Sequence, residues 1–329
     1  MLQNHLNKKL FSPECEQVPI RKGLGEGLVI AGEKDASIVA LCADLTESTQ
    51  MHLFKKKFPE RFVEMGVAEQ NLASVASGMS AMGKLPVISS YAMFSPGRNW
   101  EQIRTTICYN DRKVVIAGSH AGVSVGPDGG THQALEDIAL MRVLPNMIVI
   151  SPCDAIEAKK ATLAALSSEV SSPVYIRLAR EKTPVITTED SHFKIGKAEV
   201  LFTAEKPEVA IFATGALVSK ALLVAENLRQ NGRQVSVINV HTIKPLDIKT
   251  VVEEAKRAGA VVTVEEHQKA GGLGSAIAEC LAENHPMPIE FVGVSNLFGQ
   301  SGTPEELIEY YNLGEKAILR AITKVLGRK

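Results

Sequence analysis

The stretch that decides the fold of this chain runs from Glu64 to Met82 and reads EMGVAEQNLASVASGMSAM. A short strand-like piece ends at Gly66, and a run of small residues then predicts a long helix with Glu69 in its first turn. A carboxylate there suits the positive end of the helix dipole, and by default it is only a favourable first-turn acid. The small residues predict that the helix is closely packed on most of its sides. We therefore expect Glu69 to be partly withdrawn from water, where it can share a proton with a ligand nitrogen.

Composition gives the broad class. The 329 residues suffice for two domains of ordinary size, and 36 basic against 37 acidic residues give a formal charge of -1. This balance gives no reason to expect nucleic acid or a membrane as a partner. The N-terminus lacks an apolar targeting segment, and no later apolar run is long enough to span a bilayer. We therefore expect a soluble cytoplasmic protein. Its five cysteines show neither CxxC nor metal-ligand spacing, so we expect them to be reduced and the chain to have no metal site of its own: Cys15, Cys42, Cys108, Cys153 and Cys280.

Short apolar runs alternate with helical patterns along the chain, and they lack strict polar alternation. This pattern predicts an α/β protein whose mostly parallel sheets are covered by helices on both faces. A polar segment interrupts the pattern and predicts two consecutive domains, the second with a sheet of about four strands. The polar N-terminus is expected to be an arm that orders only on a partner. The predicted divisions are an arm at 1–18, a first domain at 19–182, a linker at 183–195 and a second domain at 196–329.

Polar residues gather where four predicted strands end, the edge at which open α/β sheets bind their ligands. The longest of these stretches, 119–132, reads SHAGVSVGPDGGTH and places two histidines and an aspartate in a glycine-rich loop. A loop of this kind is more often a site than a lone histidine on an apolar face. The other three stretches are 44–48, 66–71 and 90–98.

The same loop contains Gly122-Val123-Ser124-Val125-Gly126, which matches the nucleophile elbow of α/β-hydrolases. That elbow leads directly into a helix, whereas Pro127 and the glycines after it break any helix here. A Ser124 hydrolase therefore stays a minor alternative.

A second glycine-rich stretch, Gly271-Gly272-Leu273-Gly274, precedes a predicted helix and suggests a dinucleotide site. Ile277 stands where the last small residue of that fingerprint belongs. The better interpretation is a helix start that packs closely on a sheet. His267, nearby, is interpreted as a loop histidine with satisfied hydrogen bonds rather than a ligand contact.

Taken together, the chain from Arg21 to Lys329 resembles the second half of a transketolase. These thiamine diphosphate enzymes move two-carbon ketol units between sugar phosphates. The resemblance implies a pyrimidine-binding domain followed by the C-terminal domain of the family. It rests on four stretches in order and at the family's spacing: 43–46 (ADLT), 66–71 (GVAEQN), 126–133 (GPDGGTHQ) and 144–146 (LPN).

The resemblance also implies roles for individual residues. Glu69 resembles the glutamate that hydrogen-bonds the N1′ nitrogen of the aminopyrimidine, which favours the tautomer that activates the thiazolium. Tyr91 and Phe94 resemble the aromatic pair that flanks the pyrimidine, with Tyr where many transketolases have Phe, although core packing is the other interpretation of Tyr91. Two residues resemble groups that bind sugar hydroxyls near the reacting carbons, and His132 is also a catalytic candidate: Asp128 and His132. Four resemble the set that holds the substrate phosphate: Arg21, Ser48, His120 and Arg180.

The loop departs from the family at Pro127, where an acid is common, and at Gly130, where proline is common. The Gly-Asp-Gly motif that holds the diphosphate and its Mg²⁺ is missing. We therefore expect the C-terminal subunit of a split transketolase, inactive alone, which completes its site with a separate N-terminal diphosphate-binding subunit that holds the Mg²⁺, in an α2β2 assembly.

Three alternatives remain open. The β subunit of a 2-oxoacid dehydrogenase shares both domains, but a 2-oxoacid carries no phosphate. 1-Deoxyxylulose-phosphate synthase is nearer, but it is one long chain. A non-catalytic regulatory protein of transketolase-like fold is disfavoured by the intact Glu69, His120, Asp128 and His132.

Overall fold

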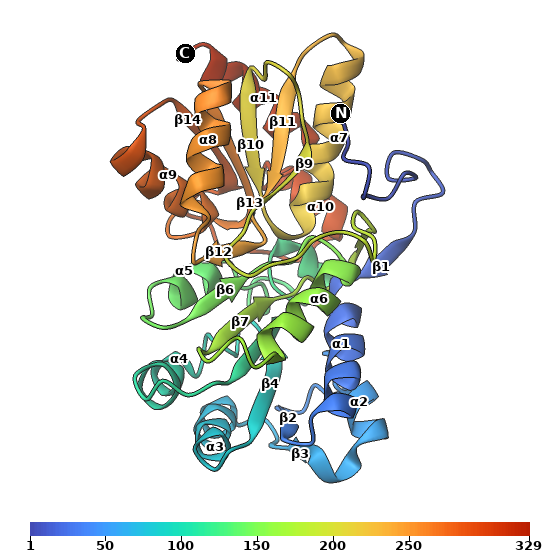
Figure 1. The fold of residues 1–329 in the computed structure, drawn as a ribbon, viewed down its shortest axis with the longest axis vertical. Helices are drawn as coiled ribbons and strands as arrows, with labels where there is room; N and C mark the ends of the chain where they lie inside the picture. Colours follow the sequence, from blue (N-terminus) through green and yellow to red (C-terminus); the bar gives the residue numbers. More distant parts are fainter.

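The computed structural model describes residues 1–329 as two α/β domains that lie end to end (Figure 1). The first domain is built on a seven-stranded sheet of order β12-β6-β7-β5-β4-β2-β3. All its pairings are parallel except that of β12 with β6. Its strands are β2 (Ile38–Cys42), β3 (Phe62–Glu64), β4 (Leu85–Tyr91), β5 (Val115–Ser119), β6 (Ile148–Ile150), β7 (Val174–Arg177) and β12 (Thr242–Lys244).

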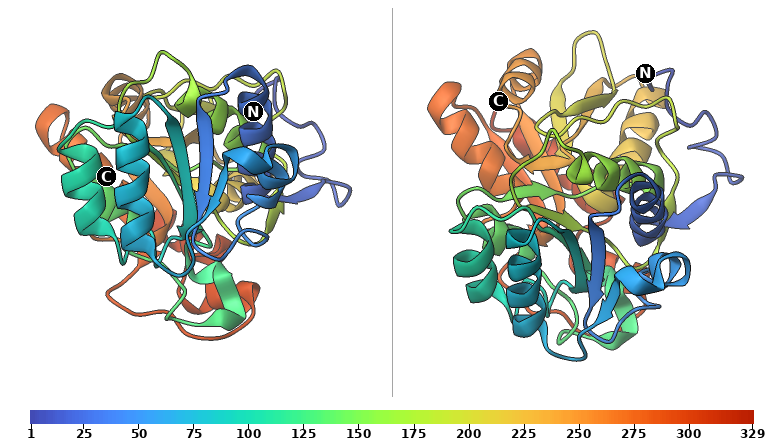
Figure 2. Two further views of the ribbon diagram at one scale, coloured as in Figure 1. Left: turned by 90° about the horizontal axis from the view of Figure 1, so that it is seen from below. Right: turned by 60° about the horizontal axis from the view of Figure 1, so that its bottom comes forward.

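Helices cover both faces of this sheet, as its buried strands require (Figure 2). One face carries α1 (Ile20–Lys34), α2 (His52–Lys57) and α6 (Ala155–Leu166). The glycines of α1 allow close contact with α6, since a Cβ on Gly23 would lie 1.9 Å from the carbonyl oxygen of Ala155. The other face carries α3 (Glu69–Ala81), α4 (Trp100–Gln102) with the π-helical turn η2 (Ile103–Cys108), and α5 (Asp137–Arg142).

The second domain has five strands, one more than expected, in the order β14-β13-β10-β11-β9. The extra strand β9 pairs antiparallel with β11 at the edge, while the other pairings are parallel. The strands are β9 (Glu199–Phe202), β10 (Val209–Ala213), β11 (Val235–Asn239), β13 (Val261–Gln268) and β14 (Ile289–Val294). The helices are α7 (Val218–Gln230), α8 (Ile248–Ala258), α9 (Leu273–Asn284), α10 (Pro304–Tyr310) and α11 (Glu315–Leu326), and short 3-10 turns lie at η1 (Pro59–Arg61), η3 (Val123–Asp128) and η4 (Gly215–Leu217).

One large hydrophobic cluster spans the two domains. Met141 and Leu144 of the first domain belong to the same buried cluster as Phe212 and Ile277 of the second. The strand β12 follows the second domain's β11 in the chain yet completes the edge of the first sheet. The domains are therefore held in a fixed relation by apolar packing and by backbone pairing.

The expectation that residues 1–18 order only on a partner is wrong. Leu6 and Leu10 are buried in the core of the second domain, and Leu2 forms a β-bridge with Phe202. Strand β1 (Gln17–Pro19) pairs antiparallel with β8 (Lys182–Pro184), inside the segment that follows the first domain. The arm escaped detection because its few apolar residues fit a surface supplied by a distant part of the chain.

The expectation that α3 is packed on most sides is also wrong for this chain. Leu72, Ala73 and Ala76 are buried against the sheet, but the opposite side of the helix faces solvent. That open side carries only small or polar side chains, at Asn71, Ser74, Gly78 and Ala81. The apolar side chains of Val67, just before α3, and Met82, just after it, are exposed, and so is that of Tyr109 at the end of η2.

All five cysteines are free and buried. No helix combines the length and the apolar character that crossing a lipid bilayer requires.

Candidate active site

Glu69 occupies the first position of α3, as the sequence predicts. The chain leaves β3, turns at Gly66 with φ +69°, and starts the helix at Glu69. Asn99, itself buried, donates from Nδ2 to the backbone oxygen of Glu69 at 2.9 Å and to Ser95 Oγ at 3.2 Å. The loop after β4 is thereby tied to the start of α3, and it leaves the Glu69 side chain only 1% exposed.

The partner of the Glu69 carboxylate is Arg98, which sequence reasoning missed. Arg98 Nη1 donates to Glu69 Oε2 at 2.7 Å, and the guanidinium carbon lies 4.9 Å from the ring centroid of Phe94. The pair borders an open hollow of about 460 Å³ that Val67 also lines. The only sequence signal was a cation in the same polar loop as Phe94, which does not reveal a contact with residue 69.

Aromatic rings form the next part of the site. The rings of Phe94 and His132 meet edge to face with their centroids 5.3 Å apart. Tyr91 lies 6.2 Å from each of them. Tyr91, Phe94 and His132 are all half-buried, so their rings can still contact a ligand. The structure thus brings together three of the residues that the sequence singled out.

His120 connects this aromatic group to the two arginines Arg21 and Arg180. Its ring stacks on Tyr91 with a centroid separation of 3.8 Å, and its Nδ1 lies 2.8 Å from Ser119 Oγ. Burial, followed by the charges of Arg21 and Arg180, lowers the pKa of His120 to about 3. His120 is therefore neutral near pH 7 and can offer a hydrogen bond but no charge.

Arg21 and Arg180 lie close enough to His120 to lower its pKa, and their charges also oppose each other. Nε and Nη1 of Arg21 are buried without any hydrogen-bond partner, and burial is the main reason that the pKa of Arg21 is lowered. Arg180 donates through Nη1 to the carbonyl oxygen of Val125. Buried guanidinium donors without an acceptor carry a free-energy cost, which an anionic ligand at this position would remove.

Two predicted residues are not tied to this group. Ser48 is half-buried and Asp128 is exposed, and neither side chain makes a hydrogen bond or an ion pair. The loop that carries Asp128 is nevertheless well anchored, because Gln133 Nε2 donates to the carbonyl oxygens of Val123, Gly126 and Gln300.

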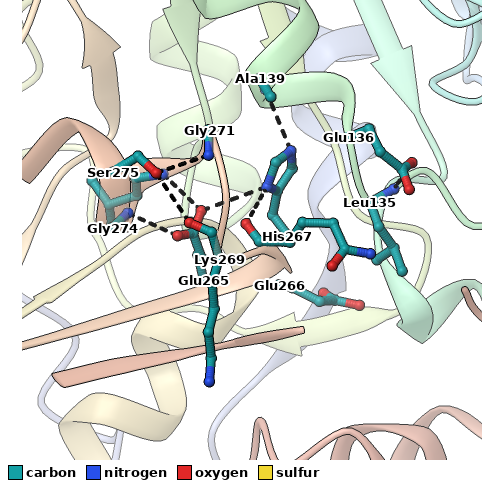
Figure 3. A network of polar contacts seen from close by, with 12 residues as sticks. Leu135, Glu136, Ala139, Glu265, Glu266, His267, Lys269, Gly271, Gly274 and Ser275 are labelled. Atoms are coloured by element: carbon teal, nitrogen blue, oxygen red, sulfur yellow. Dashed lines mark hydrogen bonds and ion pairs between the residues drawn. The ribbon is translucent and has the colours of Figure 1, made fainter. Parts of the chain in front are cut away.

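The structure contains neither the hydrolase site nor the dinucleotide site that the sequence suggested as alternatives. Ser124 is buried in η3, its hydroxyl bonds no histidine, and its backbone N–H donates to Glu266 Oε1 at 2.6 Å. At the start of α9 the carboxylate of Glu265 accepts the N–H groups of Leu273 and Gly274, both at 2.7 Å (Figure 3). These donors are already used by the protein, so a dinucleotide phosphate has nothing to bind there.

His267 is a satisfied histidine, as expected, although it lies within β13 and not in a loop. Its Nδ1 lies 2.7 Å from the carbonyl oxygen of Gln268, and its Nε2 accepts the N–H of Ala139 at 3.4 Å (Figure 3). Burial lowers the pKa of His267 to about 4, so the ring is neutral. No group of three or more His, Cys, Asp or Glu side chains is arranged to hold a metal ion.

Two family models match the chain. The model of the transketolase pyrimidine-binding domain matches residues 16–185, and that of the transketolase C-terminal domain matches residues 196–318.

Individual relatives match along nearly their whole length. A putative transketolase C-terminal section from Methanocaldococcus jannaschii is 41% identical over 313 residues, which are 94% of this chain and 97% of that protein. A 6-deoxy-6-sulfo-D-fructose transketolase subunit from Clostridium sp. (strain MSTE9) is 40% identical and covers 97% of this chain and 98% of its own. A solved structure described as a split gene transketolase, inactive beta4 tetramer, has a TM-score of 0.88 and 44% identity, covering 95% of this chain and 99% of that one.

Proposed function

Because the chain belongs to the transketolase family and comprises its pyrimidine-binding and C-terminal domains, we propose that it is the C-terminal subunit of a split transketolase. In this role it transfers a two-carbon ketol unit from a ketose phosphate to an aldose phosphate with thiamine diphosphate. The relatives that match over nearly their full length, one of them called a C-terminal section, support a subunit of this size.

The residues around Glu69 fit the pyrimidine of the cofactor. Arg98 Nη1 donates to Glu69 Oε2, which leaves Oε1 as the carboxylate oxygen for a ring nitrogen, and Glu69 lines the open hollow. Phe94 is connected to Glu69 through Arg98, which packs over its ring, and Tyr91 lies 6.2 Å further on from Phe94. The bound cofactor supplies a carbanion-stabilising thiazolium, and this chain would supply the acid, the aromatic walls and the exclusion of water. The buried carboxylate of Glu69 at the start of α3 is the observation that carries the proposal.

The substrate's anionic end fits the group formed by Arg21, His120 and Arg180. Two guanidinium groups supply charge, and the unpaired donors of Arg21 need an acceptor. Neutral His120 adds a hydrogen bond, and Ser48 would approach from its own loop. His132, edge-on to Phe94, would then lie between the cofactor and the anion site, where sugar hydroxyls and the reacting carbons belong, with Asp128 on the same loop. A 2-oxoacid carries no phosphate for this site, which disfavours the dehydrogenase alternative.

The diphosphate and Mg²⁺ would be held by a separate N-terminal subunit. The open side of α3, with exposed Val67 and Met82 at its ends, is the surface on this chain that such a subunit would cover. An α2β2 assembly follows if two of these chains pair as family halves do. The solved relative is described as an inactive beta4 tetramer, which supports the need for a second kind of subunit.

The test is reconstitution. We expect the purified chain to show no ketol transfer, and we expect transfer to appear on adding a subunit that carries the Gly-Asp-Gly motif, thiamine diphosphate and Mg²⁺. Phosphorylated donors, matched sulfonated donors and donors without an anionic group should be compared, since one relative is named for a sulfonated sugar. Turnover of sugar phosphates by this chain alone would overturn the proposal.

A further inference from the structure

Arg98 connects a buried acid to the rim of the site. The Glu69 side chain is 1% exposed and that of Arg98 is 48% exposed, and the two meet through Nη1 and Oε2 at 2.7 Å. A carboxylate withdrawn from water to this degree is costly unless a positive charge accompanies it. Arg98 supplies that charge, and a guanidinium does not lose its proton under ordinary conditions.

Two contacts fix the orientation of the Arg98 side chain. Its guanidinium packs over the face of Phe94, and the next residue, Asn99, is buried and bonded to the Glu69 backbone. With Oε2 held in this way, the Glu69 carboxylate cannot turn freely. Its second oxygen, Oε1, is the one left for a ligand, and Glu69 and Arg98 both line the hollow described above.

We propose that Arg98 is a positioning residue for the proton that Glu69 shares with the cofactor: it keeps Glu69 ionised, so that Oε1 accepts a hydrogen bond from a protonated N1′. The inference rests on the proposed function, because it concerns the partner of Glu69 in the cofactor.

The hydrogen bond between Glu69 and N1′ contains one proton, and the source of that proton depends on Arg98. In its ion pair with Arg98, Glu69 takes part as a carboxylate, and the N1′ nitrogen of the free cofactor is unprotonated near neutral pH. A hydrogen bond between the two would then require one proton from the solvent, which would be held on N1′ by the Glu69 carboxylate. No other bond forms or breaks.

Without Arg98 the balance changes. A buried carboxylate with no counter-charge takes up a proton itself. Glu69 would then be protonated before the cofactor arrives and would donate to a neutral N1′, so no proton would be taken from the solvent. Arg98 therefore decides both the number of protons taken up and the atom that carries the proton.

The experiment measures proton uptake by calorimetry. The complex of this chain with its diphosphate-binding subunit is titrated with thiamine diphosphate and Mg²⁺ in buffers of different ionisation enthalpy. We expect uptake to fall by about one proton per site from wild type to Arg98→Gln, as linkage requires. Arg98→Lys, which keeps the charge, should restore most of it. Arg104→Gln is the matched control, because Arg104 is exposed on the adjacent helical turn and has no ion-pair partner.

A second readout locates the proton. With ¹⁵N at N1′ of the cofactor, we expect the nitrogen resonance of a protonated ring in the wild-type complex and of a neutral ring in Arg98→Gln. Circular dichroism of each variant checks that it is folded, and Arg98→Met, which also removes the charge, replaces the glutamine variant if that one is not.

The outcomes separate the two proposals. If Glu69→Gln takes up as many protons as wild type, the role of Glu69 in the proposed function is wrong. If Glu69→Gln loses the uptake but Arg98→Gln keeps it in full, the role of Glu69 stands and the inference about Arg98 is overturned.

Discussion

The ring of Tyr91 lies face to face on the ring of His120, with the centroids 3.8 Å apart and the planes inclined by 20°. This stack joins the aromatic residues beside Glu69 to the cations Arg21 and Arg180. A residue expected to flank the pyrimidine thus also supports His120, which belongs to the proposed anion site.

Tyr91 variants test this double role. We expect Tyr91→Phe to keep near-normal kinetics, because the stack with His120 needs only the ring. Tyr91→Ala should raise the KM for phosphorylated donors by about 2- to 10-fold, since an aromatic pair contributes roughly 0.5–1.5 kcal/mol. Steady-state kinetics of the reconstituted enzyme measures this. A large loss in Tyr91→Phe would instead point to a role for the hydroxyl.

Arg21 should show a trade-off between stability and binding. Arg21→Met keeps the apolar stem but removes donors that are buried without partners, so the free energy of unfolding of the isolated chain should stay the same or rise. The KM for phosphorylated donors should rise about 10- to 150-fold, which corresponds to the roughly 1.5–3 kcal/mol of a charged hydrogen bond. Lys22→Met, next in sequence but exposed, is the control. A variant that loses stability without losing affinity would contradict the assignment.

Glu157 should make stability depend on pH. Its carboxylate is buried, accepts from Asn239 Nδ2 at 2.8 Å, and has a pKa raised to about 8, first by burial and then by Asp154. Between pH 4.5 and about 8 the folded chain therefore holds a proton that the unfolded chain has released. The sign follows: the free energy of unfolding falls as pH rises through this window, by at most about 1.4 kcal/mol per pH unit.

Glu157→Gln should remove this part of the pH dependence in urea unfolding curves recorded from pH 5 to pH 8. Glu169→Gln, at an exposed position, should leave it unchanged. Equal slopes in wild type and Glu157→Gln would show that Glu157 is ionised in the folded chain.

Gly78 tests the partner surface. A Cβ at Gly78 meets no atom within 4 Å, so Gly78→Arg should fold normally and gain up to about 1 kcal/mol from better helix propensity. The large side chain on the open side of α3 should nevertheless abolish assembly with the diphosphate-binding subunit, measured by size-exclusion chromatography with light scattering. Thr323→Arg, exposed on α11 of the other domain, should assemble normally. Assembly of Gly78→Arg at wild-type affinity would place the partner elsewhere.

Local signals explain what the sequence could predict. Gly66 followed by a first-turn acid marks the start of α3, and buried apolar runs such as 209–213 mark strands, because these signals act over a few residues. The helix start at Glu69 and the strand β10 were therefore found where the structure has them.

Elements that depend on distant partners were missed. Strand β12 has three residues and exists because it pairs with β6 of the other domain. Leu6 and Leu10 are buried only by the second domain. The contact of Arg98 with Glu69 spans 29 positions, and no spacing rule predicts it. For Ser48 and Asp128 the opposite holds: the family resemblance predicts them as site residues, but their side chains make no hydrogen bond or ion pair within this chain.

The hydrophobic cluster shared by the two sheets also limits how this protein can be altered. A chain cut within 183–195 would expose to water the part of the shared hydrophobic cluster that each fragment contains. It would also deprive the first sheet of its edge strand β12. We therefore expect each fragment expressed alone to aggregate through this apolar surface. A chimera that takes one domain from a relative would have to import the opposing apolar surface with it.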